Sequence, residues 1–263
     1  MRTTAVIDHI THWLKEYCTT NHQRGFVVGV SGGIDSAVTS ALCARTGLHT
    51  LCVEMPIHQA QSHVTRALEH VARLQEAHSN VILERIDLTP AFDTLERALP
   101  DSANEAMHQL ALANTRARLR MTTLYYLAGV HGYLVAGTGN KIEDFGVGFF
   151  TKYGDGGVDL SPIADLTKSE VYAMAHELGI VQSILDAAPT DGLFGDSRTD
   201  EDQIGASYPE LEWAMDLRDN GGPTDSLSDR QQQVLAIFDK RRAANRHKMD
   251  PIPVCLIPAG LKR

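Results

Sequence analysis

The stretch FVVGVSGGIDSAV, residues 26–38, decides the fold of this chain. FVVGV is a short apolar run rich in β-branched residues, which predicts a buried strand, and the apolar spacing after SGGIDS predicts a helix. A glycine-rich turn joins the two, at a point where backbone N–H groups and the positive end of the helix dipole favour a phosphate. The stretch therefore predicts a strand, a phosphate-binding loop and a helix.

The same strand and helix pattern recurs along the first half of the chain. LCVEM at 51–55, VILERI at 81–86 and YLVAGTG at 133–139 read as strands, with a long helix near 58–77 and a helical region reaching about residue 130. Alternating strands and helices predict an α/β fold with a Rossmann-like, doubly wound parallel sheet of about five strands. Flanking helices cover both faces, and ligands gather at the carboxyl ends of the strands.

The first segment and the second half add helices and loops around this sheet. One helical face is expected to be buried at the start of the chain, made of Val6, Ile7, Ile10, Trp13, Leu14 and Tyr17. Capping boxes predict two later helices, from Thr167 to about Leu178 and from Ser228 to about His247. Residues 151–162 read as an ordered loop, and residues 189–205 fit a surface linker and a mobile lid equally well.

Composition limits the classes of function. The 263 residues suffice for one well-buried α/β domain, and the net charge of −9 disfavours a protein that binds nucleic-acid backbones. The N-terminus lacks a signal-peptide pattern, and no stretch is apolar for long enough to cross a membrane, so we expect a cytoplasmic protein. The four cysteines are scattered singly, which predicts reduced and mostly buried thiols.

The turn GVSGGIDS, Gly29 to Ser36, points to ATP chemistry. It is neither the mononucleotide P-loop nor the dinucleotide fingerprint, because the spacings of G-x-x-x-x-G-K-[ST] and G-x-G-x-x-G are missing. Ser31 and Ser36 offer hydroxyls, the paired glycines allow close backbone approach, and Asp35 can hold a metal ion. The plain alternative is a glycine-rich turn that only caps a helix. SGGxDS after an apolar strand resembles the PP-loop of the ATP-pyrophosphatase superfamily, which has the adenine nucleotide alpha hydrolase-like fold and cleaves ATP to AMP and pyrophosphate.

Five further segments occur in a fixed order, and together they narrow the resemblance. They are NTRARLRM at 114–121, GTGNKIE at 137–143, FFTKYGDGGVDLSPIADLTKSEV at 149–171, PTDGLFGDSRTDEDQIGASYPELE at 189–212 and HK at 247–248. In this order they resemble the NAD synthetase family over roughly residues 5–250. The resemblance implies a ligase that amidates deamido-NAD with ATP through an NAD-adenylate, in the last step of NAD biosynthesis.

The resemblance assigns binding residues one by one. It implies magnesium ligands at Asp35 and Glu143, although EDFGVGFF is one residue longer than in many relatives, so Asp144 could share this role. Met249 stands where many relatives carry Arg. The positions implied for ATP are Gly29, Val30, Ser31, Gly32, Gly33, Ile34, Asp35, Ser36, Thr138, Lys168 and Thr190, and those for deamido-NAD are Arg118, Lys152, Asp159, His247 and Lys248. Arg116 and Arg120, two positions either side of Arg118, are expected to be solvated or salt-bridged.

Asp155 and Lys168 are the catalytic residues that the resemblance implies. An Asp between glycines is usually a turn former and a lysine at a helix end is usually solvated, so only the context favours these roles. Asp155 would gather ammonium and remove its proton, since ammonium is mostly protonated near neutral pH. Lys168 would steady the phosphates while negative charge develops.

The sequence also gives expectations about the nitrogen donor and about two alternative functions. Only about twenty-five residues precede the ATP loop, which leaves no room for a glutamine amidotransferase domain, so we expect one domain over residues 1–263 that uses free ammonia. A separate amidase subunit remains an alternative, and the resemblance implies a homodimer. Another ATP-pyrophosphatase, such as a tRNA thiolase, is disfavoured by the scattered cysteines. A non-catalytic nucleotide-binding module is the second rival.

Overall fold

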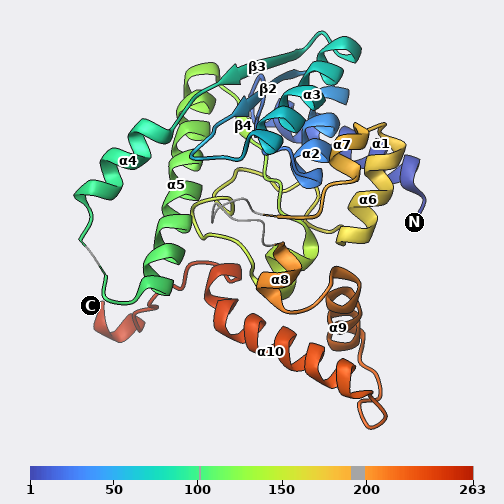
Figure 1. Ribbon diagram of the computed structural model, residues 1–263, viewed down its shortest axis with the longest axis vertical. Coiled ribbons are helices and arrows are strands. Elements are labelled where there is room, and N and C mark those ends of the chain that lie inside the picture. Colours follow the sequence, from blue (N-terminus) through green and yellow to red (C-terminus); the bar gives the residue numbers. More distant parts are fainter. Residues whose placement is uncertain (101, 191–198, 263) are drawn as a thin grey trace.

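A parallel β-sheet forms the centre of the molecule in the computed structural model, which describes residues 1–100, 102–190 and 199–262. The strands are β1 (Gly25–Gly29), β2 (His49–Glu54), β3 (Val81–Arg85) and β4 (Leu134–Val135), in the order β3-β2-β1-β4. The chain moves outward from β1 to β3 and then returns to the other side of β1 (Figure 1). A topological switch point therefore lies between β1 and β4, as the predicted doubly wound α/β fold requires.

The predicted strand count is corrected, because the described residues form four strands rather than about five. Beyond the short β4, Ala136 makes one isolated parallel bridge to Leu160. Two hydrogen bonds flank this bridge: Asp159 N donates to the Val135 carbonyl at 3.0 Å, and Gly137 N donates to the Leu160 carbonyl at 2.8 Å. Glycine and aspartate are poor strand formers, and they dominate the segment before Leu160. A loop that makes only these few backbone contacts therefore lies beside β4, where a fifth strand was expected.

Helices cover both faces of the sheet (Figure 1). Phe26 and Val28 of β1 point into the first core, while Val27 points into the second, as the alternation of a strand requires. The first core is closed by α1 (Thr3–Thr20), α2 (Ile34–Arg45), α3 (Gln61–Ala77), α6 (Lys168–Glu177) and α7 (Gln182–Leu185). The second core is closed by α4 (Thr89–Ala98) and α5 (Glu105–His131).

A third core lies beyond the ends of the strands. Its fully buried members include Ile142, Leu211 and Phe238. These come from a π-helical turn, η1 (Ile142–Val147), and from α8 (Asp200–Ile204), α9 (Tyr208–Asn220) and α10 (Asp229–Met249). This helical layer, at the bottom of Figure 1, supplies the second wall of the site described below.

Most of the helix signals are confirmed, with small shifts. The capping boxes of Thr167 with Glu170 and of Ser228 with Gln231 are both formed, at the starts of α6 and α10. α3 begins at Gln61 rather than near residue 58, and α10 continues to Met249. The predicted buried face of α1 is partly wrong. Trp13 and Tyr17 are each 37% exposed, and α1 packs through Ile7, Ile10, Leu14 and Cys18 instead.

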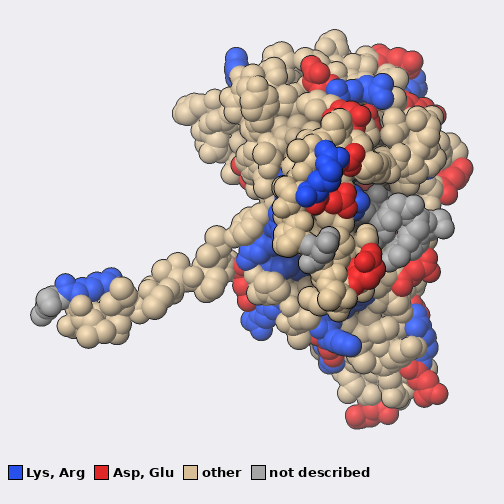
Figure 2. All heavy atoms as spheres, turned by 60° about the vertical axis from the view of Figure 1, so that its left-hand side comes forward, with Lys and Arg blue, Asp and Glu red and all other residues tan. Residues whose placement is uncertain are grey.

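The chain after α10 is extended and projects from the body of the molecule (Figure 2). It ends in a short 3-10 turn, η2 (Ala259–Leu261). Cys255 lies on this segment and is exposed, whereas Cys18, Cys43 and Cys52 are buried, and burial raises the pKa of Cys52 to about 12. Within the described residues, no helix is both long and apolar enough to cross a bilayer.

Candidate active site

The loop between β1 and α2 is held by its own serines. Ser36 Oγ donates to the Gly33 carbonyl at 2.9 Å and accepts from Ser31 N at 3.2 Å, and the two serine hydroxyls lie 3.3 Å apart. Gly32 has φ of +79°, and a Cβ there would lie 2.4 Å from the His63 carbonyl oxygen, so only glycine fits. Among the described residues no side chain caps the start of α2. The first N–H groups of α2 therefore remain available to an anion.

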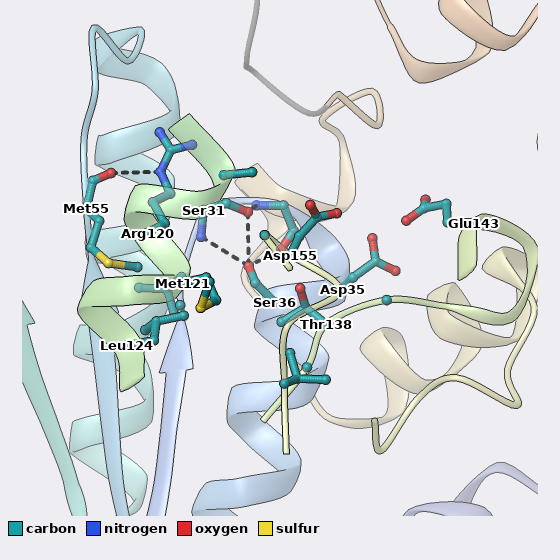
Figure 3. A pocket seen from close by; sticks show the side chains of 18 of the residues that line it. Ser31, Asp35, Ser36, Met55, Arg120, Met121, Leu124, Thr138, Glu143 and Asp155 are labelled. Atoms are coloured by element: carbon teal, nitrogen blue, oxygen red, sulfur yellow. Dashed lines mark hydrogen bonds between the residues drawn. The ribbon is translucent and has the colours of Figure 1, made fainter. Parts of the chain in front are cut away.

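A cavity of about 260 Å³ opens at this loop, at the switch point of the sheet (Figure 3). The structure brings most of the predicted ATP positions to its walls: Gly29, Val30, Ser31, Gly33, Ile34, Asp35, Ser36, Thr138, Lys168 and Thr190. Gly32 lies behind the wall, against α3. The lining also contains Glu143, Asp144 and Asp155. Residues predicted for phosphates, metal and ammonia therefore face one space.

The opposite wall of the cavity was missed by the sequence analysis. Its residues are Glu54 at the end of β2 and Met55 after it, Gln59, His63, Val64 and Ala67 in or near α3, and Arg120, Met121 and Leu124 of α5. Arg120, which was expected to be solvated or salt-bridged, lines the cavity and binds two groups from the chain between β2 and α3. Its Nε donates to the Met55 carbonyl at 3.0 Å and its Nη2 donates to Gln59 Oε1 at 2.9 Å (Figure 3). Met55 was recognisable, because it follows β2 at the edge of the sheet where ligands gather.

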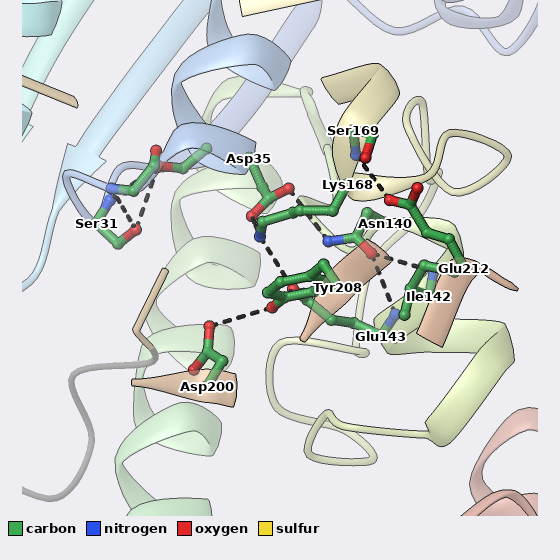
Figure 4. Close-up of polar contacts among 12 residues, drawn as sticks. Ser31, Asp35, Asn140, Ile142, Glu143, Lys168, Ser169, Asp200, Tyr208 and Glu212 are labelled. Atoms are coloured by element: carbon green, nitrogen blue, oxygen red, sulfur yellow. Dashed lines mark hydrogen bonds and ion pairs between the residues drawn. The ribbon is translucent and has the colours of Figure 1, made fainter. Parts of the chain in front are cut away.

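Lys168 joins the two predicted metal ligands. Its Nζ lies 2.5 Å from Asp35 Oδ2 and 3.0 Å from Glu143 Oε1 (Figure 4). The lysine side chain is only 4% exposed, and it also lies over the Tyr208 ring, 4.8 Å from the ring centroid. Asp35 and Glu143 thus converge on one positive charge at the mouth of the phosphate loop.

Asn140 fixes the spacing of the two carboxylates, and the sequence analysis did not single it out. It is fully buried, and its Nδ2 donates to Asp35 Oδ1 at 3.2 Å. Its Oδ1 accepts from the backbone N–H groups of Ile142 and Glu143, each at 3.1 Å. One amide therefore bonds the carboxylate of α2 to the turn that carries Glu143 (Figure 4).

Tyr208 connects Glu143 to the helical layer. Its hydroxyl lies 2.5 Å from Glu143 Oε1 and 3.3 Å from Asp200 Oδ2 (Figure 4). Burial first, and then the negative charges of Glu143 and Asp200, raise the pKa of Tyr208, so the hydroxyl remains a donor. Tyr208 opens α9 and Asp200 opens α8, and both belong to the segment that the family resemblance covers.

The segment EDFGVGFF, for which the resemblance implied one residue more than in many relatives, starts within a turn of unusual geometry. Residues Ile142–Val147 form a π-helical turn, which is rare and often occurs at functional sites. The turn places Glu143 toward Lys168, while Asp144 lies against Gly139, where a Cβ would meet the Asp144 carboxylate at 2.1 Å. Of the two neighbours, Glu143 is therefore the one that shares a cation with Asp35.

The pKa values at this centre reflect burial opposed by the lysine. Burial raises the pKa of Asp35 more than the Lys168 ammonium lowers it. For Glu143, burial also opposes ionisation, but Lys168 and the hydrogen bonds from Tyr208 and Asn140 outweigh it, so the pKa lies below its usual value. Burial favours neutral Lys168, yet the two carboxylates together raise its pKa. The lysine is therefore charged at neutral pH.

The protein side chains supply only part of the ligand set that a magnesium ion needs. Within the described ranges no group of three or more His, Cys, Asp or Glu side chains converges on one point. Two carboxylates that already share a cation are nevertheless the protein contribution that magnesium usually takes, since it keeps waters and binds substrate phosphates. The donor set is compatible with magnesium held between Asp35, Glu143 and a nucleotide.

Asp155 lies in the loop that follows η1 and is exposed. Thr151 N donates to its Oδ1 at 2.9 Å, which orients the carboxylate, and the residue lines the cavity. The protein atoms around it raise its pKa by desolvation, and the negative charge of Glu143 adds to this effect. A carboxylate with a raised pKa beside a cavity is a candidate proton acceptor.

The five residues predicted for deamido-NAD lie outside the cavity lining. Arg118 Nη2 donates to the Lys152 carbonyl at 3.3 Å, and Lys152 Nζ donates to the His247 carbonyl at 2.6 Å. Lys248 Nζ donates to the carbonyls of Gly148 and of Phe150, the latter at 2.6 Å. Arg118, Lys152, His247 and Lys248 are thus connected across α5, the loop and α10.

Asp159 stands apart from these four residues. It accepts from the Tyr125 hydroxyl at 3.0 Å and from Val135 N at 2.8 Å, at the edge of β4. Of the segment 189–205, which was expected to be a linker or a lid, residues 191–198 lie outside the described residues. Thr199 caps α8, and Gly205 follows the last residue of that helix.

Fold and site together define an α/β nucleotide-binding protein whose phosphate loop faces paired carboxylates and a buried lysine. A sequence model of the NAD synthase family matches residues 6–252. The chain is 39% identical over 254 residues to the NH(3)-dependent NAD(+) synthetase of Alkaliphilus oremlandii, covering 94% of this chain and 96% of the relative. It is 39% identical over 206 residues to that of Carboxydothermus hydrogenoformans, covering 78% and 82%.

A solved structure agrees with these relatives. The NMN synthetase of Francisella tularensis superposes with a TM-score of 0.81 at 30% identity, covering 98% of this chain and 99% of that one. The chain belongs to the NAD synthase family. It is accordingly a ligase of the NAD synthase type, which forms a C–N bond.

Proposed function

We propose that the chain converts deamido-NAD, ATP and ammonia to NAD, AMP and pyrophosphate. The observation that carries this proposal is that the phosphate loop, the Asp35–Lys168–Glu143 centre and Asp155 face one cavity. The nicotinate carboxylate attacks the α-phosphate of ATP and pyrophosphate leaves, which gives an NAD-adenylate. Ammonia then attacks the acyl carbon and AMP leaves. The curated relatives carry the description NH(3)-dependent, which favours free ammonia as the donor.

In the adenylation step, the loop from Gly29 to Ser36 binds the phosphates through its N–H groups and hydroxyls. Lys168 stabilises the negative charge that develops on the phosphates, through its ammonium group. Thr138 and Thr190 line the cavity around the nucleotide. Asp35 and Glu143 would hold magnesium, and the ion would supply positive charge that offsets the charge of the phosphates. Met55, Gln59 and Leu124 line the remaining wall, which we assign to the adenosine.

In the amidation step, Asp155 binds ammonium through its carboxylate and accepts the proton that ammonium must lose before attack. The raised pKa of Asp155 makes the carboxylate a stronger base than an ordinary aspartate. Arg118, Lys152, Asp159, His247 and Lys248 hold deamido-NAD, because its pyrophosphate and carboxylate require cations and its ribose requires an acceptor. We further propose one domain over residues 1–263, a homodimer, and a cytoplasmic location.

Nicotinate mononucleotide is a second candidate substrate. The solved structure with a TM-score of 0.81 is an NMN synthetase, whose product is a mononucleotide rather than a dinucleotide. The five residues assigned to deamido-NAD lie outside the cavity lining, so the lining by itself does not distinguish a mononucleotide from a dinucleotide. Nicotinate mononucleotide is therefore the alternative substrate, amidated by the same two steps.

The test supplies the purified chain with ATP, Mg²⁺ and ammonium, and offers deamido-NAD or nicotinate mononucleotide in parallel. Nucleotides are separated by chromatography, and pyrophosphate is measured independently. One AMP and one pyrophosphate for each NAD formed, with a higher kcat/KM for the dinucleotide, is the expected result. A preference for the mononucleotide would mean that nicotinate mononucleotide, and not deamido-NAD, is the substrate. Release of ADP and phosphate would overturn the mechanism. ATP binding without turnover on either acid would favour the nucleotide-binding module.

A further inference from the structure

Thr151 is a buried threonine in the loop that carries Asp155. It is 5% exposed, whereas Asp155 is exposed. Its N–H donates to Asp155 Oδ1 at 2.9 Å, and its carbonyl accepts from Gly154 N at 2.9 Å and from Gly156 N at 3.2 Å. The carboxylate of Asp155, and the residues on both sides of it, are therefore bonded to one backbone position.

The side chain of Thr151 connects this loop to α5. Its Oγ1 donates to Asn114 Oδ1 at 2.6 Å, although 37 residues separate the two in the chain. Asn114 opens the segment NTRARLRM, and α5 packs on the sheet through Leu112 and Leu127. Loss of either partner would leave a part-buried polar group without its hydrogen bond, which costs free energy. The bond therefore holds the loop to a helix that the core keeps in place.

Close packing between the loop and α5 supports the same contact. A Cβ at Gly154 would lie 2.8 Å from Ala117 Cβ and 2.8 Å from Thr151 Cγ2, so no side chain fits there. Ala117 is 6% exposed and belongs to the helix that carries Asn114. A shift of Thr151 would therefore move a tightly packed loop, and Asp155 with it.

A second side chain of α5 contacts the next residue of the loop. Arg118, one helical turn after Asn114, donates from Nη2 to the Lys152 carbonyl at 3.3 Å. Arg118 and Lys152 are both assigned to deamido-NAD above, so the substrate would compete for this contact. The shorter bond between Asn114 and Thr151 carries no such second duty. It is therefore the contact with α5 that holds the loop while substrate is bound.

We propose that Thr151, held by Asn114, is a positioning residue for the amidation step and fixes the Asp155 carboxylate where ammonium binds. This inference rests on the proposed function and adds two residues to it. Ammonium gives one proton to the Asp155 carboxylate, the ammonia nitrogen attacks the acyl carbon, and AMP leaves. The Thr151 N–H only donates a hydrogen bond to Oδ1, and no proton passes through the threonine.

The first test is Thr151→Val, which keeps the shape of the side chain and removes its hydroxyl. Because small misplacements of a catalytic group are costly, we expect kcat/KM for ammonium to fall about 10- to 100-fold. KM for ATP and the first equivalent of pyrophosphate should not change. Thr151→Ser keeps the hydroxyl and should retain most of the amidation rate. Thr122→Val is the matched control, since this exposed threonine of α5 bonds only to its own helix, at the Arg118 carbonyl.

A second test asks whether Thr151 acts through Asp155. Thr151→Val is combined with Asp155→Asn, and the amidation rate of the double variant is compared with those of the two single variants. A residue that only positions the carboxylate adds little once the carboxylate is gone, so the two effects should not multiply. Asn114→Ala removes the acceptor of the Thr151 hydroxyl and should reproduce the Thr151→Val defect. Urea unfolding shows whether each variant is folded under the assay conditions.

The possible results separate this inference from the proposed function. A wild type that makes no NAD from ammonium would overturn the proposed function itself. With an active wild type, equal rates for Thr151→Val and Thr122→Val would overturn the positioning role alone. Loss of the pyrophosphate burst in Thr151→Val, or a full additional loss in the Asp155→Asn background, would overturn it as well. Should Thr151→Val fail to fold, the same comparisons made with Asn114→Ala decide the question.

Discussion

Lys168 Nζ lies 2.5 Å from Asp35 Oδ2, although 133 residues separate the two in the chain. The lysine begins α6 and the aspartate is in the first turn of α2, so the ion pair joins two helices that lie on the same face of the sheet. With Glu143 it forms a buried centre of one positive and two negative charges. The free protein therefore keeps an excess of negative charge at the position that a magnesium ion would neutralise.

Lys168→Met tests this charge balance. Removal of the ammonium leaves two buried carboxylates without their cation, and we expect a loss of about 3 kcal/mol in the free energy of unfolding. Mg²⁺ should restore part of that loss, and should raise the melting temperature of the variant more than that of wild type. Calorimetric or fluorescence melting with and without Mg²⁺ gives the comparison, with Lys15→Met, on an exposed lysine of α1, as control. Equal magnesium effects on wild type and variant would contradict the shared site.

Tyr208→Phe removes the hydroxyl that lies 2.5 Å from Glu143 Oε1. The loss of such an orienting hydrogen bond typically lowers metal affinity by about 10- to 100-fold. We therefore expect pyrophosphate release to need a correspondingly higher Mg²⁺ concentration, with little change in KM for ammonium. Tyr126→Phe, on an exposed tyrosine, is the matched control. Unchanged magnesium dependence in a folded Tyr208→Phe protein would remove Tyr208 from the site.

Asp155→Asn separates the two half-reactions. If the carboxylate serves ammonia, the variant still releases a first equivalent of pyrophosphate, but it makes NAD about 10²–10⁴-fold more slowly. Extra ammonium recovers part of the loss if Asp155 mainly concentrates the cation. Rapid-quench sampling of pyrophosphate and NAD in one time course measures both steps, and the exposed Asp165→Asn is the control. Loss of the pyrophosphate burst would place Asp155 in the ATP step.

The pH dependence of amidation follows from the same residue. The folded protein raises the pKa of Asp155, so the basic form is lost earlier than for an ordinary aspartate as the pH falls. We expect the amidation rate to decline on the acid side before the adenylation rate does, after correction for the supply of free ammonia. Single-turnover rates of NAD formation from preformed adenylate, between neutral and acidic pH, give the test. Parallel decline of both steps would contradict it.

His70 predicts a pH dependence of stability that is independent of catalysis. It is 2% exposed, its Nε2 lies 2.9 Å from Ser40 Oγ, and burial lowers its pKa to about 4. Because the folded pKa is below the unfolded value, the stabilisation is complete above about pH 6.5 and is lost as the pH falls toward 4. The two values correspond to about 3 kcal/mol. Urea unfolding at several pH values should show this slope in wild type, and a flatter slope in His70→Gln.

The central fold could be predicted because its signals are local. FVVGV, LCVEM and VILERI each became a strand, and the phosphate loop lies where the turn after the first strand placed it. The fifth strand that was predicted is not formed among the described residues, because the segment around Leu160 makes only one isolated bridge, to Ala136, and two flanking hydrogen bonds. The exposure of Trp13 and Tyr17 on α1 was missed for a related reason. Helical spacing predicts which side of a helix is buried, but the neighbouring elements determine how wide that buried side is.

Site residues that belong to a sequence motif could be predicted. Residues that join the site only through contacts in the folded structure could not. Asp35 and Ser36 belong to the loop motif, and both line the cavity. Asn140 and Tyr208 act through bonds to other side chains, and no local pattern distinguishes such residues from ordinary polar ones. The place of Arg120 in the cavity wall could not be predicted, because Met55 and Gln59, to which it donates hydrogen bonds, come from a distant part of the chain.

The ion pair of Asp35 with Lys168 also sets an order of assembly during synthesis. A chain that has emerged from the ribosome only as far as β4 contains Asp35 and its whole phosphate loop, but neither Lys168 nor Tyr208. Contacts of such long sequence separation form late, because the intervening loop must close first. The nascent N-terminal half therefore carries an uncompensated carboxylate, and the centre that would bind substrate is completed only when α6 and α9 have docked.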